Sequence, residues 1–114
     1  MNGWGWIGVD LDGTLAHYDE WKGAAHIGAP IPRMVERVKR WLSEGLEVKI
    51  MTARVCMDAG DVAAARAAIQ AWCVEHIGVA LPVTNEKDFA MTELWDDRAV
   101  GVHRNTGVRV GDDE

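Results

Sequence analysis

Two aspartates separated by one leucine follow a short apolar run near the start of the chain, in the stretch DLDGT at residues 10–14. Side chains two apart in a strand share a face, so the carboxylates of Asp10 and Asp12 can act together. Gly13 permits a sharp turn that lets the second carboxylate lean over the first. One carboxylate can then attack phosphorus and form an aspartyl phosphate while the other transfers a proton.

Further polar residues follow other apolar runs of the sequence. Thr52 comes after a second run, Lys87 lies in a polar loop, and Asp96 and Asp97 follow a later run. Carboxylates gathered at one edge repel each other, and a cation would resolve that repulsion. An all-oxygen set suits Mg²⁺, whereas zinc would want His or Cys at ligand spacing. An ammonium group and a hydroxyl are natural partners of phosphate oxygens.

The elements that would position these residues alternate between strand and helix patterns. Apolar runs and alternation predict strands, and apolar spacing of three and four predicts helices. We expect Pro32 to begin the first helix and Gly45 and Gly78 to end the two helices. Residues 15–30 have no clean period, which indicates a loop or short flap. The expected elements are strands at 6–9, 46–50, 81–84, 93–95 and 99–102, helices at 31–42 and 60–77, and a C-terminal hairpin over 99–110.

This order predicts an α/β fold with a Rossmann-like parallel sheet and helices on both faces. Ligands of such sheets sit beyond the carboxyl ends of the strands. Asp10, Asp12, Thr52, Asp96 and Asp97 all follow predicted strands, so we expect them to converge on one edge.

Length and composition limit the class of protein. With 114 residues, the chain 1–114 is expected to form a single domain. The net charge of −6 makes nucleic acid an unlikely partner, and no apolar run is long enough to span a membrane. Two cysteines and no signal-like segment favour a reduced, cytoplasmic setting. The six tryptophans leave a homodimer open, although core packing is the favoured interpretation.

The stretch DLDGTL at residues 10–15 resembles the first motif of the haloacid dehalogenase superfamily of phosphatases and phosphotransferases. Thr52 in IMTAR, Lys87 in TNEKD and Asp96-Asp97 in ELWDD are similar to the second, third and fourth motifs, in the same order. The gaps between motifs hold no full cap domain, so the resemblance is to a small capless type with a short flap. Asp12 and Thr52 match the phosphatase branches better than the dehalogenases.

The resemblance implies a role for each matched residue. Asp10 would be the nucleophile, Asp12 the general acid and base, and Lys87 would orient Asp10 and offset charge. Thr52 and the backbone N–H of Ala53 would hold phosphate oxygens. Asp10, the carbonyl of Asp12 and Asp96 would hold Mg²⁺, and Asp97 would be a further or alternate ligand. His17, Trp21 and Arg54 are candidate substrate contacts, with packing roles as their alternative.

The function expected from these residues is a Mg²⁺-dependent phosphomonoester hydrolase acting on a phosphorylated small molecule or an extended phosphate ester. A non-catalytic or weakly active binding module of the same fold is the main alternative, and a nucleic-acid end phosphatase is a less favoured one. A phospho-accepting signalling receiver has similar parts. Its acidic pair would precede the phosphorylated aspartate, whereas here the pair comes after Lys87.

Overall fold

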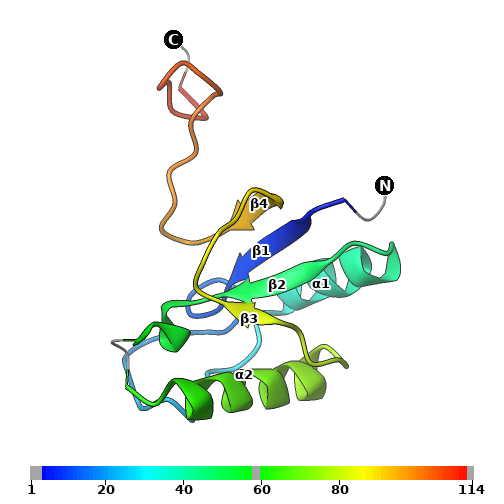
Figure 1. Ribbon diagram of the computed structural model, residues 1–114, viewed down its shortest axis with the longest axis vertical. Helices are drawn as coiled ribbons and strands as arrows, with labels where there is room; N and C mark the ends of the chain where they lie inside the picture. The colour runs from blue at the N-terminus through cyan, green and yellow to red at the C-terminus, as the bar shows by residue number, and fades with distance from the viewer. Residues whose placement is uncertain (1–3, 58–59, 113–114) are drawn as a thin grey trace.

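The computed structural model describes residues 4–57 and 60–112 of the chain. Four strands form one parallel sheet in the order β3-β2-β1-β4 (Figure 1). The elements are β1 (Trp6–Asp10), α1 (Pro32–Ser43), β2 (Val48–Met51), the 3-10 helix η1 (Ala53–Val55), α2 (Val62–His76), β3 (Val83–Thr84) and β4 (Met91–Trp95). The predicted α/β class and parallel sheet are confirmed.

Helix α1 follows directly from its sequence. Pro32 stands in its first turn, where a missing N–H costs nothing, and a buried stripe begins at Met34 and Val35. Gly45 adopts a φ of 84° just beyond the end. The N–H of Leu46 donates to the carbonyl of Trp41 at 3.0 Å, which satisfies one of the last carbonyls of the helix.

Helix α2 begins at Val62, two residues after the start predicted from the sequence. Asp61 caps it, because its Oδ1 accepts the N–H of Ala64 at 3.0 Å. The apolar face of α2 buries Ala65, Ile69 and Cys73. The short strand β3 occupies one edge of the sheet, which is where Pro82 directly before it is tolerated.

Both helices cover the same face of the sheet, so the prediction of helices on both faces is wrong. The chain passes from β1 to β2 and from β2 to β3, each time to the adjacent strand and in the same direction across the sheet. Because both crossovers are right-handed, α1 and α2 lie on the same face of the sheet. The packing agrees, because both helices share a single core with alternate residues of β1 and β2. The sheet residues of that core are Ile7, Val9, Val48 and Ile50.

The opposite face of the sheet is covered by the 85–90 connection. The buried Trp6 belongs to this face, because a Cβ atom on Gly8 would meet the Trp6 ring at 3.2 Å. Its indole N–H donates to Asp88 at 2.9 Å, and the ammonium group of Lys49 lies 4.6 Å from the ring centroid. The connection therefore packs on this face in place of a helix.

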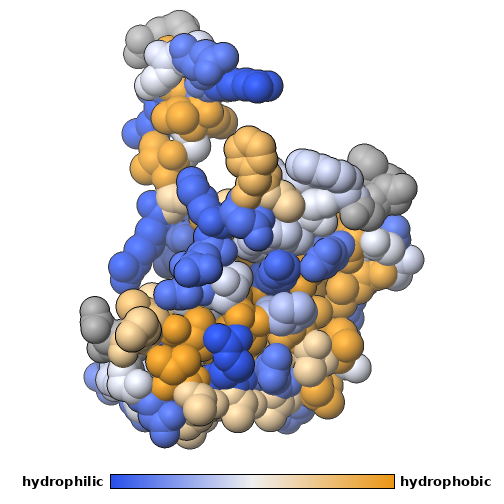
Figure 2. Space-filling view, viewed as in Figure 1, coloured by the Kyte–Doolittle hydropathy of each residue, from blue (hydrophilic) through white to orange (hydrophobic). Residues whose placement is uncertain are grey.

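The predicted last strand at 99–102 is wrong, and β4 is the last strand of the described chain. Beyond β4 the chain projects away from the body (Figure 1). In place of the predicted hairpin over 99–110, the described chain forms a turn in which Val102 and Arg109 make a single antiparallel β-bridge. Val100, Val102 and Val110 are exposed. Hydrophobic colour appears accordingly on the surface of the projecting segment (Figure 2). An apolar run without a neighbouring strand or core to cover it does not become a sheet strand.

Residues 15–30 form an irregular loop that is closed at its base. The N–H of Ile31 donates to Leu15 and the N–H of His17 donates to Ala29, each at 2.8 Å. The Trp72 indole of α2 donates to the carbonyl of Gly28 at 3.0 Å. Within the residues that the structure describes, no helix is both long enough and apolar enough to cross a membrane.

Candidate functional site

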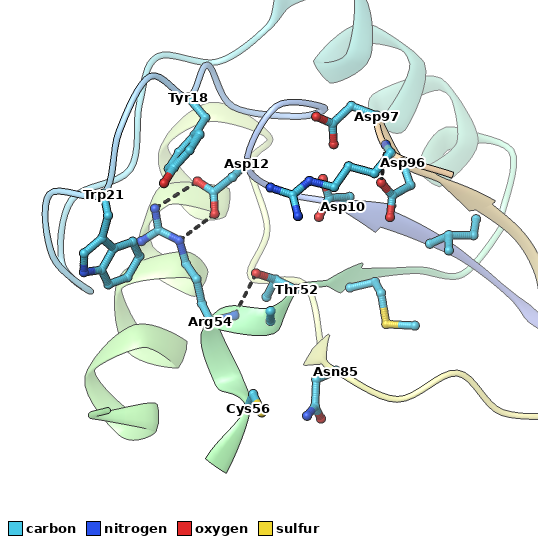
Figure 3. A pocket seen from close by; sticks show the side chains of 14 residues that line it. Asp10, Asp12, Tyr18, Trp21, Thr52, Arg54, Cys56, Asn85, Asp96 and Asp97 are labelled. Atoms are coloured by element: carbon cyan, nitrogen blue, oxygen red, sulfur yellow. Dashed lines mark hydrogen bonds and ion pairs between the residues drawn. The ribbon is translucent and has the colours of Figure 1, made fainter. Parts of the chain in front are cut away.

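Three carboxylates meet at the carboxyl ends of two neighbouring strands. Asp10 is the last residue of β1, and Asp96 and Asp97 directly follow β4. The pairing of Val9 with Trp95 brings these strand ends side by side. One carboxylate oxygen from each of the three aspartates lies within 4.8 Å of the others (Figure 3). The predicted convergence of Asp10 with Asp96 and Asp97 is therefore present.

Asp10 is the aspartate whose ionisation this arrangement changes most clearly. Burial, the negative charge of Asp96 and the carboxylate of Asp97 raise the pKa of Asp10 from 3.8 to about 7. The Thr14 hydroxyl opposes this effect with a hydrogen bond to Oδ2 of Asp10 at 3.3 Å. A partly buried set of oxygen ligands with mutual repulsion fits a hard divalent cation such as Mg²⁺.

The turn after β1 shapes the site. Gly13 adopts a φ of 91°, and its N–H donates to the carbonyl of Ala16 at 2.8 Å. The N–H groups of Leu15 and Ala16 both donate to the carbonyl of Leu11, at 3.0 and 2.9 Å. Leu11, Leu15 and Ala16 are fully buried, so the core anchors the turn that carries Asp12 and Thr14.

The side chain of Asp12 does not join the carboxylate group. Its two oxygens accept hydrogen bonds from Nε and Nη2 of Arg54, at 2.8 and 2.9 Å, and it points toward this guanidinium (Figure 3). The side chain of Arg54 is only 5 % exposed, so this ion pair is largely shielded from water. Only the main-chain carbonyl of Asp12 is expected from the sequence to hold a metal ion, and this ion pair of its side chain does not test that expectation.

Thr52 and Ala53 lie beside the carboxylates, after β2. The backbone N–H of Thr52 donates to the carbonyl of Thr84 at 2.9 Å, which fixes the end of β2 against β3. The Thr52 hydroxyl oxygen accepts the N–H of Arg54 at 3.1 Å and so caps η1. Within the described residues, the O–H of Thr52 donates to no protein acceptor.

These groups line an open cavity of about 810 Å³. Tyr18 and Trp21 of the 15–30 loop border it together with Arg54 (Figure 3). Asp10, Asp12, Met51, Thr52, Ala53, Cys56, Asn85, Leu94, Asp96, Asp97 and Arg98 complete the lining. The volume is in the range of pockets that enclose a small organic ligand.

Two predicted site residues lie outside this cavity. Lys87 is exposed in the 85–90 connection and is not among the residues that line the cavity. His17 is also exposed, with its Nε2 3.8 Å from a carboxylate oxygen of Asp19. The structure brings Trp21 and Arg54 to the cavity as predicted and leaves these two out.

Tyr18, Asn85 and Arg98 also line the cavity and were not predicted from the sequence. Asn85 directly follows β3, and Arg98 lies three residues beyond β4. The rule that ligands sit at the carboxyl ends of parallel strands could have pointed to both. The backbone N–H of Arg98 donates to Oδ1 of Asp96 at 2.7 Å, which helps to fix the orientation of that carboxylate. Tyr18 carries no such signal, because its place depends on the path of the loop.

Comparisons of the chain with models of protein families, with curated proteins and with solved structures found no match. The chemistry of the site is therefore inferred from its side chains, their contacts and the cavity that they line.

Proposed function

We propose that this chain is a Mg²⁺-dependent phosphomonoester hydrolase that works through an aspartyl phosphate on Asp10. The observation that carries the proposal is the grouping of Asp10, Asp96 and Asp97 at the carboxyl end of a parallel sheet. Thr52, which directly follows the neighbouring strand β2 and lines the same cavity, supports it. The resemblance of residues 10–15 to the first haloacid dehalogenase motif points to the same chemistry.

The carboxylates of Asp10, Asp96 and Asp97 would hold the magnesium ion, together with the carbonyl of Asp12. When bound, the ion supplies positive charge that offsets the negative charge of the phosphate group. The raised pKa of Asp10 supports a site that needs such a charge, since burial and the neighbouring acids disfavour its ionised form.

The side chains then divide the reaction into two displacements. An oxygen of Asp10 attacks phosphorus, the bond from phosphorus to the ester oxygen breaks, and Asp12 donates a proton to the leaving oxygen. Water next attacks the phosphorus of the aspartyl phosphate, Asp12 accepts the proton, and the bond from phosphorus to Asp10 breaks. The Thr52 hydroxyl and the Ala53 N–H would hold the phosphate oxygens through both steps.

The cation assigned to the site differs from the one implied by the family resemblance. Lys87 lies outside the cavity, whereas Arg98 lines it and follows the carboxylates directly in sequence. We therefore assign the charge-offsetting role of Lys87 to Arg98.

The 15–30 loop would act as the short flap expected from the sequence. It contributes Tyr18 and Trp21 to an otherwise open cavity, which suits a phosphorylated small molecule or an extended phosphate ester.

The decisive experiment measures release of phosphate from an aryl phosphate with and without Mg²⁺. Asp10→Asn should abolish turnover, whereas the matched control Asp112→Asn, in the projecting C-terminal segment, should leave it unchanged. Acid quenching followed by intact-mass measurement should detect a phosphorylated wild-type chain but no phosphorylated Asp10→Asn chain. Full activity of Asp10→Asn would refute the nucleophile assignment.

A non-catalytic binding module is the second candidate, and one observation favours it. Both oxygens of Asp12 already accept a hydrogen bond from Arg54, which leaves each oxygen only one further lone pair for a transferred proton. A binding module would take up Mg²⁺ and a phosphate ester without turnover. Calorimetric titration combined with the phosphate-release assay separates the two functions.

A further inference from the structure

Arg54 is a buried charged side chain whose three guanidinium nitrogens all have partners. Nε and Nη2 donate to the two oxygens of Asp12, and Nη1 donates to the carbonyl of Ala24 at 3.3 Å. Its Cζ lies 4.8 Å from the centroid of the Trp21 ring, which is a cation–π distance. Arg54 therefore joins Asp12, in the turn after β1, to Trp21 and Ala24 of the 15–30 loop.

These contacts argue against Arg54 as a primary phosphate-binding group. Binding a phosphate oxygen would require a nitrogen to leave Asp12 or Ala24, and the side chain is only 5 % exposed. An arginine that holds a carboxylate with two parallel hydrogen bonds fixes the plane of that carboxylate as well as its position. Lysine, with a single ammonium group, cannot reproduce this geometry.

The loop side of the network contacts Arg54 at Trp21 and Ala24, while Ala24 and Ile27 also pack against the hydrophobic core. Trp21 is half-exposed, and it stacks on the guanidinium at the border of the cavity (Figure 3). The carbonyl of Ala24 accepts its hydrogen bond from the same group. Other contacts hold the base of the loop, at Leu15, Ala29 and Gly28.

We propose that Arg54 is a positioning residue that links the 15–30 loop to Asp12, so that the seated loop and the productive orientation of the Asp12 carboxylate form together. The catalytic part of this inference rests on the proposed phosphatase function. The structural part, which is the mutual dependence of loop order and the Asp12 contact, stands apart from it.

The chain offers a matched control for an arginine stacked on a tryptophan. The Cζ of Arg37 lies 4.8 Å from the ring centroid of Trp95, outside the cavity, and within the described residues it pairs with no carboxylate. Arg37→Met therefore removes a similar stacking contact without touching Asp12. Arg54→Met and Arg54→Lys are compared with it, and circular dichroism checks that each variant is folded.

The first test compares two esters that differ in their need for proton donation. The alcohol of an alkyl phosphate is a poor leaving group that needs a proton from an aligned acid. The nitrophenolate of a nitrophenyl phosphate leaves without such a proton. Arg54→Met should lower kcat for the alkyl ester by about 100-fold or more, since a positioned acid contributes about 10²–10⁴-fold. The same variant should lower kcat for the nitrophenyl ester by less than about tenfold. Arg37→Met should change neither rate. Equal losses on both esters would show a merely structural role and overturn the proposal.

A double variant shows whether Arg54 acts through Asp12. The alkyl ester should be hydrolysed no more slowly by Asp12→Asn/Arg54→Met than by Asp12→Asn alone, because both changes remove the same positioned group. Losses that multiply would contradict the proposal. If Arg54→Met does not fold, Arg54→Lys takes its place, because it keeps the charge and loses the paired geometry.

The second test needs no turnover. Amide hydrogen exchange over residues 18–28 should become faster in Arg54→Met and, reciprocally, in Asp12→Asn, whereas Arg37→Met should leave it unchanged. Unchanged exchange in Asp12→Asn would refute the link between the loop and Asp12. A wild-type chain that hydrolyses neither ester would refute the proposed function, and this exchange experiment would still decide the link.

Discussion

Gly13 lies directly against the carboxylate of Asp97. A Cβ atom on Gly13 would come within 2.5 Å of Oδ2 of Asp97, and the φ of Gly13 is 91°. Two features therefore favour glycine at position 13, namely its left-handed backbone conformation and the Asp97 carboxylate packed against it. This relationship connects the sharp turn after β1 to the acids that follow β4.

Replacing Gly13 with alanine should therefore disturb both stability and the metal site. We expect a cost of about 1–2 kcal/mol from the left-handed backbone alone, and a displaced Asp97 should weaken Mg²⁺ binding. Gly45→Ala is the matched control, because Gly45 has a φ of 84° with no atom within 4 Å of an added Cβ. Urea unfolding should show a loss for both variants and a larger one for Gly13→Ala, because an added Cβ atom there also meets Asp97. Calorimetric titration with Mg²⁺ should show weakened binding for Gly13→Ala only, and equal affinities would contradict the proposed metal site.

Stability of the metal-free protein should depend on the ionisation of Asp10. Its pKa is raised from 3.8 to about 7, so the folded chain binds this proton more tightly than the unfolded chain does. The contribution to stability is fully present below about pH 4 and is lost as the pH rises through about 7. Urea midpoints measured between about pH 5 and pH 8 should fall with rising pH, and Asp10→Asn should flatten this dependence relative to wild type.

Magnesium should reverse the pH effect on stability. The cation competes with the proton for Asp10, so added Mg²⁺ should stabilise the chain more at about pH 8 than at about pH 5. Thermal unfolding with and without Mg²⁺ at the two pH values checks this expectation. An equal shift of Tm at both values would show that the ion binds elsewhere.

The two candidate cations of the site should differ in their effect on turnover. Lys87→Ala should leave kcat/KM for an aryl phosphate nearly unchanged, because the side chain is exposed outside the cavity. Arg98→Ala should lower kcat/KM by about tenfold or more, which is the loss of roughly one charge-assisted hydrogen bond. Steady-state kinetics on both variants decides between them, and a large loss in Lys87→Ala alone would restore the role implied by the family resemblance.

The two cysteines should differ in reactivity toward an alkylating reagent. Burial raises the pKa of the Cys73 thiol to about 11, and this thiol lies fully enclosed on the buried face of α2. Cys56 is partly exposed and lines the cavity. Peptide mapping after brief treatment of the native chain should find the label on Cys56, and on Cys73 only in denaturant. Early labelling of Cys73 would contradict the described packing of α2.

Local patterns in the sequence were enough to predict the elements that follow a simple rule. Pro32, the stripe from Met34 to Trp41 and Gly45 specify helix α1, because helix capping and apolar spacing act within one or two turns. The apolar run after Gly5 gave β1. The same reasoning failed at 99–102, since an apolar run forms a strand only where another strand or a core receives it.

The tertiary structure decided which face of the sheet the helices cover and which polar residues share the cavity. The types and spacing of residues placed Asp10, Thr52, Asp96 and Asp97 at strand ends, and parallel pairing in the order β3-β2-β1-β4 brings those ends to one edge. Sequence alone did not reveal that Arg54 would hold Asp12 or that Lys87 would lie outside the cavity. Both depend on the paths of the 15–30 loop and the 85–90 connection, and such paths are set by long-range packing that no local pattern encodes.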